Sequence, residues 1–289
     1  MNNKIYLNIS ADSTDINSLR QDLANIKAWG FDGAEIGLKA LPLMISGKIN
    51  QPFVDYVQGI LQEYDLSYSA HIADGLDLRT SDSLELHKKA LHTSIDICAQ
   101  LSLSPLVLHF EQDSGDAAVE AQFLRFHREA AEYAATRSVA LVLENIEIEH
   151  YLPALEMVKA INHPNLTMCL DVGHLYLSAK LLDYSFEDAV RACAPYVSHC
   201  HMHDNTGIFE HMRIENHHLY NTLPMSYRIA YGRGDIHMPP LYCDVPIPFV
   251  IEELKKAGYQ GIYACEYPGK TFTPFNAEIC SNLRALIEK

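Results

Sequence analysis

The chain has 289 residues, of which 48% are hydrophobic, so it can fold as one large domain or two small ones around a sizeable core. Lys and Arg number 22 against 37 Asp and Glu, and the formal net charge is −15 at pH 7. A surface this acidic repels phosphate backbones and anionic membranes, which disfavours nucleic acid and membranes as partners.

The seven cysteines are scattered and form no Cys-x-x-Cys pair, which indicates reduced thiols rather than a disulfide framework. The first residues contain no apolar stretch of signal-peptide length. No window approaches the roughly 20 apolar residues that a membrane span requires. We therefore expect a cytoplasmic protein.

Short runs rich in Val, Ile and Leu alternate with longer segments of helical spacing. The runs predict eight strands, at residues 5–10, 33–37, 67–72, 105–110, 139–145, 166–171, 196–203 and 262–267. Residues 18–21 and 82–85 have the spacing of capping boxes and predict helix starts, and residues 274–287 predict a last helix.

Strands that alternate with helices pair in parallel through right-handed crossovers. Eight such units favour a closed (β/α)8 TIM barrel, an α/β fold, and no linker or low-complexity tract divides residues 1–289. We therefore predict one domain. Residues 205–245, after the seventh strand, are too long for an ordinary connection and are expected to form an irregular loop that covers the site.

Functional residues of such a barrel lie at the carboxyl ends of its strands. The third to eighth predicted strands end on side chains that can bind metals, namely His71, His109, Glu144, Asp171, His201 and Glu266. Because alternate residues of a strand share a face, Glu144 continues the inward face of Val142, and Glu266 that of Ala264. These side chains are therefore expected to meet at one mouth of the barrel.

Carboxylates inside a barrel are costly unless a cation compensates them, and no Lys or Arg stands at the same strand ends. A divalent metal ion is the simplest compensation. Its predicted ligands are Glu144, Asp171, His201 and Glu266. Three oxygen donors and one imidazole suit Mn²⁺ best, and Zn²⁺, Mg²⁺ or Co²⁺ are compatible with them.

The other histidines leave two interpretations open. His71 and His109 either build a second metal position with Glu144 as the bridge or hydrogen-bond the substrate. His174 has the same two options, as a metal ligand or a substrate contact. His199 and His203 are predicted to be structural, because a lone His at a strand end is usually a hydrogen-bonded structural residue.

Residues 205–245 also carry candidate substrate contacts. Arg213, Arg228, Arg233 and His237 lie in this segment, and a guanidinium fork suits the planar oxygens of a phosphate or carboxylate. One of these arginines is therefore expected to pair with an anionic group of the substrate.

These motifs, in this order, resemble the xylose-isomerase-like TIM barrels over essentially the whole chain. The residues that carry the resemblance are Leu143-Glu144-Asn145, Leu170-Asp171-Val172-Gly173-His174, His201-Met202-His203-Asp204, Gly232-Arg233-Gly234-Asp235-Ile236 and Cys265-Glu266-Tyr267-Pro268. The family includes ketose 3-epimerases, inosose and dehydroshikimate dehydratases, hydroxypyruvate isomerases and AP endonucleases of the endonuclease IV type.

The resemblance implies that the four predicted ligands hold one metal ion and that Glu144 and Glu266 act as the acid/base pair. It implies an isomerase or epimerase of a small sugar, keto-sugar or related polyol, with two-glutamate proton transfer through a metal-stabilised enediolate. A dehydratase would use the same metal and bases. Because members of the family often associate, the resemblance also implies that the chain can form homo-oligomers.

The endonuclease IV type offers the alternative of a zinc-dependent hydrolase with three metal ions. His71, His109 and His174 match part of that cluster, whose third ion also takes an Asp-x-His pair. Alignment on the turn at residues 232–234 places Ser226 and Arg228 at that pair, and neither is a natural ligand. We therefore expect the isomerase or epimerase before the hydrolase.

Overall fold

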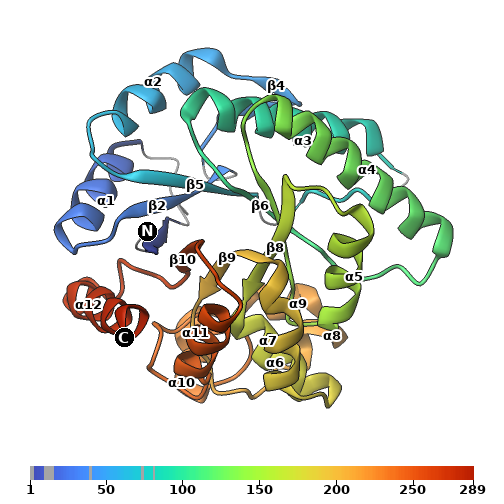
Figure 1. Cartoon of the computed structure of the whole chain (residues 1–289). Coiled ribbons are helices and arrows are strands. Elements are labelled where there is room, and N and C mark those ends of the chain that lie inside the picture. The colour runs from blue at the N-terminus through green and yellow to red at the C-terminus, as the bar shows by residue number, and fades with distance from the viewer. Residues whose placement is uncertain (1–2, 10–15, 39–40, 73–74, 81) are drawn as a thin grey trace.

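The computed structural model describes residues 3–9, 16–38, 41–72, 75–80 and 82–289, and its centre is a closed barrel of strands (Figure 1). In chain order these are β1 (Lys4–Ile9), β2 (Gly33–Gly37), β5 (Ser67–Ile72), β6 (Leu106–His109), β7 (Leu141–Glu144), β8 (Leu166–Asp171), β9 (Val197–Met202) and β10 (Ile262–Cys265). Around the barrel the order is β1-β10-β9-β8-β7-β6-β5-β2. Every neighbouring pair is parallel, so the predicted TIM barrel is confirmed.

Helices follow the strands and surround the barrel (Figure 1). They are α1 (Ile16–Ala28), α2 (Gln51–Leu61), α3 (Leu84–Leu101), α4 (Ala117–Thr136), α5 (Tyr151–Ile161), α6 (Val172–Leu182), α7 (Phe186–Cys193), the 3-10 turn η2 (Ala194–Tyr196), α11 (Ile247–Lys256) and α12 (Asn276–Glu288). A short antiparallel hairpin of β3 (Met44–Ile45) and β4 (Lys48–Ile49), which the sequence does not predict, precedes α2.

The predicted elements are present: β2, β5 and β8 have the predicted bounds, and β6, β7, β9 and β10 are shorter than predicted. For example, β7 covers 141–144 of the predicted 139–145, because its pairing with β6 and β8 is confined to those residues. The end of the first predicted strand, Ser10, lies outside the described residues.

Both predicted capping boxes are wrong. α1 already includes Ser18, and the residue before α3 is Ser83, whose side chain makes no capping hydrogen bond. Ser83 adopts φ 63°, and its carbonyl accepts from the backbone of Leu86 at 2.8 Å, so backbone geometry rather than a side chain starts this helix.

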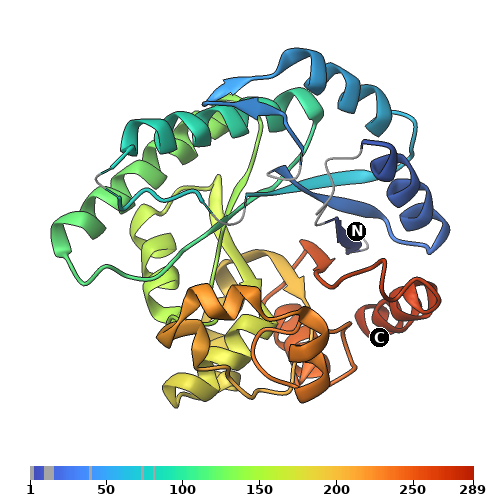
Figure 2. The ribbon, with the colours of Figure 1, turned by 180° about the vertical axis from the view of Figure 1, so that it is seen from behind.

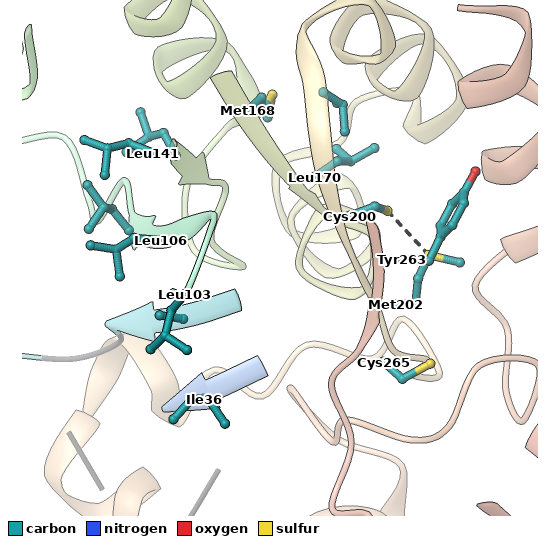
Figure 3. Packing of buried hydrophobic residues seen from close by; sticks show 14 of the residues in the cluster. Ile36, Leu103, Leu106, Leu141, Met168, Leu170, Cys200, Met202, Tyr263 and Cys265 are labelled. Carbon is teal, nitrogen blue, oxygen red and sulfur yellow. Dashed lines mark hydrogen bonds between the residues drawn. The ribbon is translucent and has the colours of Figure 1, made fainter. Parts of the chain in front are cut away.

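Alternation along the strands separates two apolar clusters. Outward side chains such as Leu106, Leu141 and Met168 join the large core between barrel and helices, part of which Figure 3 shows. Inward side chains of the same strands, Val107, Val142 and Cys169, form a small separate cluster. The interior of the barrel therefore has little apolar filling, and its space is taken by polar side chains.

The segment after β9 contains three short helices, which corrects the expectation of an irregular loop. They are α8 (Met212–Glu215), α9 (His217–Thr222) and α10 (Met225–Tyr231), and Figure 2 shows them in orange, gathered on one side of the barrel. An antiparallel bridge joins Asp204 to Met238, with backbone hydrogen bonds of 2.8 and 2.9 Å. This bridge returns the end of the segment to the mouth of the barrel.

Two general expectations concern the cysteines and the membrane. All seven cysteines are free thiols, as expected from their spacing. No helix within the described ranges has both the length and the apolar character needed to cross a bilayer.

Candidate metal centre

The imidazole of His201, near the end of β9, is the centre of the site. Its Nδ1 lies 3.2 Å from Glu144 Oε1, 3.6 Å from Asp171 Oδ2 and 3.0 Å from Glu266 Oε2. These carboxylates end β7 and β8 and follow β10, so parallel neighbouring strands deliver them to one place. The structure thus brings together the four residues that the sequence predicts as ligands of one ion, which we call the central cluster.

The central cluster fits a divalent cation. Both oxygens of Glu144, Oε2 of Glu266 and Nδ1 of His201 are buried without a hydrogen-bond partner among the described residues. Buried polar atoms are rarely left in this state. Ligands about 2.1 Å from one ion lie within about 4.2 Å of each other, and the donor atoms of the central cluster lie within 4.8 Å of one another. Carboxylate oxygens with one imidazole suit Mn²⁺ or Mg²⁺.

Charge also favours a cation at this place. Burial raises the pKa of the Glu144 carboxyl, but His201, His109 and His174 outweigh burial and hold it well below its usual range. Burial likewise raises the pKa of Glu266, and His201 and His71 bring it well below that range. Burial lowers the pKa of His71, while Glu144 and Glu266 raise it to about 10. The carboxylates are therefore ionised and need positive charge beside them.

Glu35, in the middle of β2, is a functional residue that the sequence reasoning missed. It is fully buried, and its Oε1 lies 3.0 Å from His201 Nε2, on the side of the ring opposite the central cluster. Its Oε2 contacts His199 Nε2 at 2.8 Å, and Asn8 and Ser69 donate hydrogen bonds to the carboxylate. A carboxylate behind a ligand histidine fixes its ring orientation. The sequence does contain an indication of this role, because Glu35 shares the inward face of a predicted strand with Gly33 and Gly37.

His71 and His109 form a second candidate position with Glu144. Their Nε2 atoms lie 3.0 Å apart, and they approach Glu144 Oε2 to 3.3 and 3.5 Å. The other oxygen, Oε1, faces His201 at 3.2 Å and His174 at 3.4 Å. Glu144 therefore has a different set of imidazoles on each oxygen, which is the arrangement of a carboxylate that bridges two ions.

A third candidate position lies beside His174 and corrects the alignment on residues 232–234. His174 Nε2 is 3.2 Å from Asp235 Oδ2, and the same oxygen is 2.7 Å from His237 Nε2. Asp235 and His237 therefore form an Asp-x-His pair beside His174, whereas the alignment places that pair at Ser226 and Arg228. The bridge between Asp204 and Met238 explains the difference, because it holds the residues just before Met238 against the end of β9.

His203 and Gly173 position Asp171. His203 Nε2 contacts Asp171 Oδ1 at 2.9 Å, and the amide of Asn145 accepts from the Asp171 backbone at 3.0 Å. A Cβ on Gly173 would lie 2.1 Å from the His203 ring, so only glycine permits this contact. The structural roles predicted for His199 and His203 agree with these contacts, although His203 also borders the third position.

A cavity of about 840 Å³ reaches the site. Of the predicted residues, its lining includes His71, His109, His174, Glu266, Arg228 and His237. Glu144 is not part of the described lining, because the imidazoles around it cover it. Arg233 also lies outside the lining, with its side chain 56% exposed and 3.7 Å from Glu210.

Comparison with known proteins identifies the family and the fold. A family model described as xylose isomerase-like TIM barrel matches residues 23–288. A search of curated proteins finds none that match this sequence.

Several solved structures share the fold at low sequence identity. A D-tagatose 3-epimerase-like protein superposes with a TM-score of 0.72 at 18% identity, over 99% of this chain and 98% of the other. A xylose isomerase-like TIM barrel protein from Mycobacterium smegmatis, in complex with magnesium, gives 0.74 at 17% identity over 98% and 96%. The 3-keto-D-glucoside 4-epimerase of E. coli gives 0.66 at 15% over 98% and 99%.

Proposed function

Because this chain belongs to the xylose isomerase-like TIM barrel family, we propose that it is a divalent-metal-dependent isomerase of a small polyhydroxylated carbonyl compound. One observation carries the proposal. Glu266 is the residue of the central cluster that also lines the cavity, with a side chain 15% exposed. A carboxylate in contact with both a metal position and a substrate cavity is suited to move a proton at a carbon next to a metal-polarised carbonyl.

The cation, Glu266 and His71 have different roles in the proposed reaction. When bound, a divalent cation supplies Lewis-acid polarisation of neighbouring carbonyl and hydroxyl oxygens of the substrate. Glu266 Oε2 points toward the other ligands, and Oε1 accepts from Asn8 at 3.2 Å and lies 3.4 Å from His71 Nδ1. We assign Oε1 as the base that takes the proton from one carbon and returns it to the next. His71 holds that oxygen in place.

The burial of Glu144 favours isomerisation over epimerisation. Epimerisation needs a second base on the opposite face of the substrate, and Glu144 is fully buried behind imidazoles. Transfer of a proton between adjacent carbons on one face needs only one carboxylate. In place of an acid/base pair of Glu144 and Glu266, we therefore propose Glu266 as the single base and Glu144 as a metal ligand.

The substrate that we propose is a small molecule and not nucleic acid. A cavity of about 840 Å³ admits a sugar-sized compound. The net charge of −15 opposes a nucleic-acid backbone. Mn²⁺ or Mg²⁺ is the proposed ion at the central cluster.

The test combines metal content with proton exchange. Wild-type protein and Glu266→Gln would be loaded with Mn²⁺ and incubated with aldoses and ketoses in D₂O, and deuterium incorporation followed by NMR. We expect exchange in the wild type and a loss of about 10²–10⁴-fold in the variant. The matched control is Glu252→Gln, at an exposed position of α11, and this variant should catalyse deuterium exchange as the wild type does. Full exchange by Glu266→Gln with its metal bound would refute the single-base assignment.

A second candidate, metal-assisted phosphoester hydrolysis, is favoured by the two-sided surroundings of Glu144. Adjacent ions bridged by a carboxylate are typical of sites that activate water for phosphoryl chemistry. Elemental mass spectrometry that finds two or three zinc ions per chain, together with hydrolysis of a model phosphodiester and no carbon-bound deuterium exchange, would replace the isomerase with this candidate.

A further inference from the structure

Three arginines line the cavity, and their partners differ. Arg79 makes a two-pronged contact with the Glu120 carboxylate, at 2.7 and 2.8 Å, and also donates to the Phe110 carbonyl. Arg213 contacts Glu147 Oε1 at 2.5 Å. Both charges are therefore compensated within the protein, and neither guanidinium is free to bind an anionic ligand at low cost.

Arg228, on α10, has no carboxylate partner among the described residues. Its Nη1 donates to the Tyr220 hydroxyl at 2.8 Å and to the Asp235 carbonyl at 3.2 Å, and both acceptors are uncharged. Its Nε is buried without a hydrogen-bond partner within the described part of the chain. A half-buried guanidinium with spare donors and no carboxylate within 4 Å among the described residues is unusual, because arginine stays protonated at all relevant pH values.

The position of Arg228 relates this charge to the metal site. Arg228 donates to the backbone of Asp235, and the carboxylate of the same residue contacts His174 and His237 at the third candidate position. Arg228 thus contacts the backbone of a candidate metal ligand. Arg228 and Glu266 line the same cavity.

We propose that Arg228 binds an anionic substituent of the substrate, so that the ligand of this cavity is an acidic sugar bearing a phosphate or a carboxylate. The inference rests on the proposed function for the sugar part of the ligand, and on Arg228 for the acidic part. The bound anion supplies the direct carboxylate or phosphate partner that Arg228 lacks among the described residues. A guanidinium pairs with a phosphate and with a carboxylate alike. The proposal therefore specifies a negatively charged substituent, and the experiment distinguishes phosphate from carboxylate.

The test compares matched probes on the metal-loaded protein. Isothermal titration would measure the affinity of D-ribose, D-ribose 5-phosphate, D-ribonate and inorganic phosphate. We expect the phosphate or the carboxylate form to bind at least about tenfold more tightly than D-ribose, the effect of one charged hydrogen-bond partner. Whichever acidic form shows the gain identifies the substituent.

Variants of Arg228 test whether this residue causes the tighter binding of the acidic probe. Arg228→Gln removes the charge and, because its side chain is two bonds shorter, also the hydrogen bonds to Tyr220 and the Asp235 carbonyl, and it should lose about tenfold of the preference. Arg228→Lys should retain part of it. Arg233→Gln, outside the cavity lining, should behave as wild type. Metal content and thermal melting of each variant would show that the site is intact.

Two results would overturn the inference. Equal affinities for the neutral and acidic probes in the wild type would show that no anion subsite exists, as would no measurable binding of any acidic probe. A preference that survives in Arg228→Gln would place the anion on the metal ions instead. Deuterium exchange through Glu266 is measured separately, so the isomerase proposal can fail while the dependence on Arg228 holds, and the reverse.

Discussion

The ring of His201 shows how one side chain can depend on two groups of carboxylates. Its Nδ1 faces the central cluster, and its Nε2 lies 3.0 Å from Glu35, which is held in turn by Asn8, Ser69 and His199. Burial raises the pKa of Glu35, but His201 and His199 bring it well below its usual range, so the carboxylate is ionised. An ionised carboxylate behind the ring increases the basicity of the ligand nitrogen.

We therefore predict that Glu35→Gln weakens metal binding although Glu35 is not a ligand. The expected loss is about 10–100-fold in affinity, the usual effect of removing such a partner. Competition with a chromophoric chelator would measure the metal affinity, and Glu252→Gln, at an exposed position of α11, is the control. An affinity within twofold of wild type would show that Glu35 only fills space.

Residue identities in the site could be predicted where position on a strand decides them. The central cluster follows from strand ends that share a face, and the structure assembles those four residues. Asp235 and His237 could not be predicted in the same way, because their place depends on the pairing of Asp204 with Met238 across a long segment. Glu35 does not follow from the same rule, because it lies within β2 and not at the end of a strand.

Asp204 is one of the residues that attach the segment between β9 and α11 to the barrel. The Asp204 carboxylate accepts from the backbone of Cys243 at 2.8 Å, Val245 at 2.9 Å and Asn205 at 2.8 Å. It is fully buried, and its own backbone forms the bridge to Met238. Asp204 therefore joins both ends of the segment that carries Arg228 and His237 to the end of β9.

We predict that Asp204→Ala loosens this segment and leaves the barrel closed. The free energy of unfolding should fall by about 2–4 kcal/mol, since each backbone donor left without a partner costs about 1–3 kcal/mol and water recovers part of that. Hydrogen exchange should become faster in residues 205–245 and stay slow in β6 and β7. Asp204→Asn, which retains one oxygen, should show a smaller effect, and exposed Asp65→Ala none. Uniformly faster exchange throughout the barrel would contradict the local role.

The secondary structure could be predicted from sequence where burial is regular. Strands buried on both faces give short apolar runs, and all eight were recognised. The helices α8 to α10 were missed because they are short and contribute little to the core, with Tyr220 as their buried residue. Periodicity cannot identify a helix that packs so few side chains.

At the scale of the whole molecule, the site concentrates acidic groups inside a protein that is already acidic. Glu35, Glu144, Asp171 and Asp235 are buried or nearly so within or beside the barrel, in a chain of net charge −15. Histidines compensate part of this charge, as the raised pKa of His71, about 10, and of His237, about 9, indicates after the opposing effect of burial. Bound cations would compensate more of it.

We predict that chelation destabilises the protein. An ion present at 100 times its dissociation constant contributes about 2.7 kcal/mol, so EDTA should lower the melting temperature by about 5–10 °C for a chain of this size. Addition of excess Mn²⁺ should restore it. His201→Ala should respond much less to EDTA, whereas His218→Ala, at an exposed position, should respond as wild type. An unchanged melting curve in the wild type would argue against a resident ion.

The closure of the barrel by β1 and β10 also determines when the site can form during synthesis. Glu266 follows the last strand, and Asn8, which donates to Glu266 and to Glu35, comes from the first, so residues that support the site are separated by most of the chain. A nascent chain on the ribosome cannot complete the metal centre until β10 and Glu266 have left the exit tunnel. Acquisition of the ion would therefore report that the chain has been translated past Glu266, and fragments that stop before it would be left with an open sheet and uncompensated carboxylates for quality control to recognise.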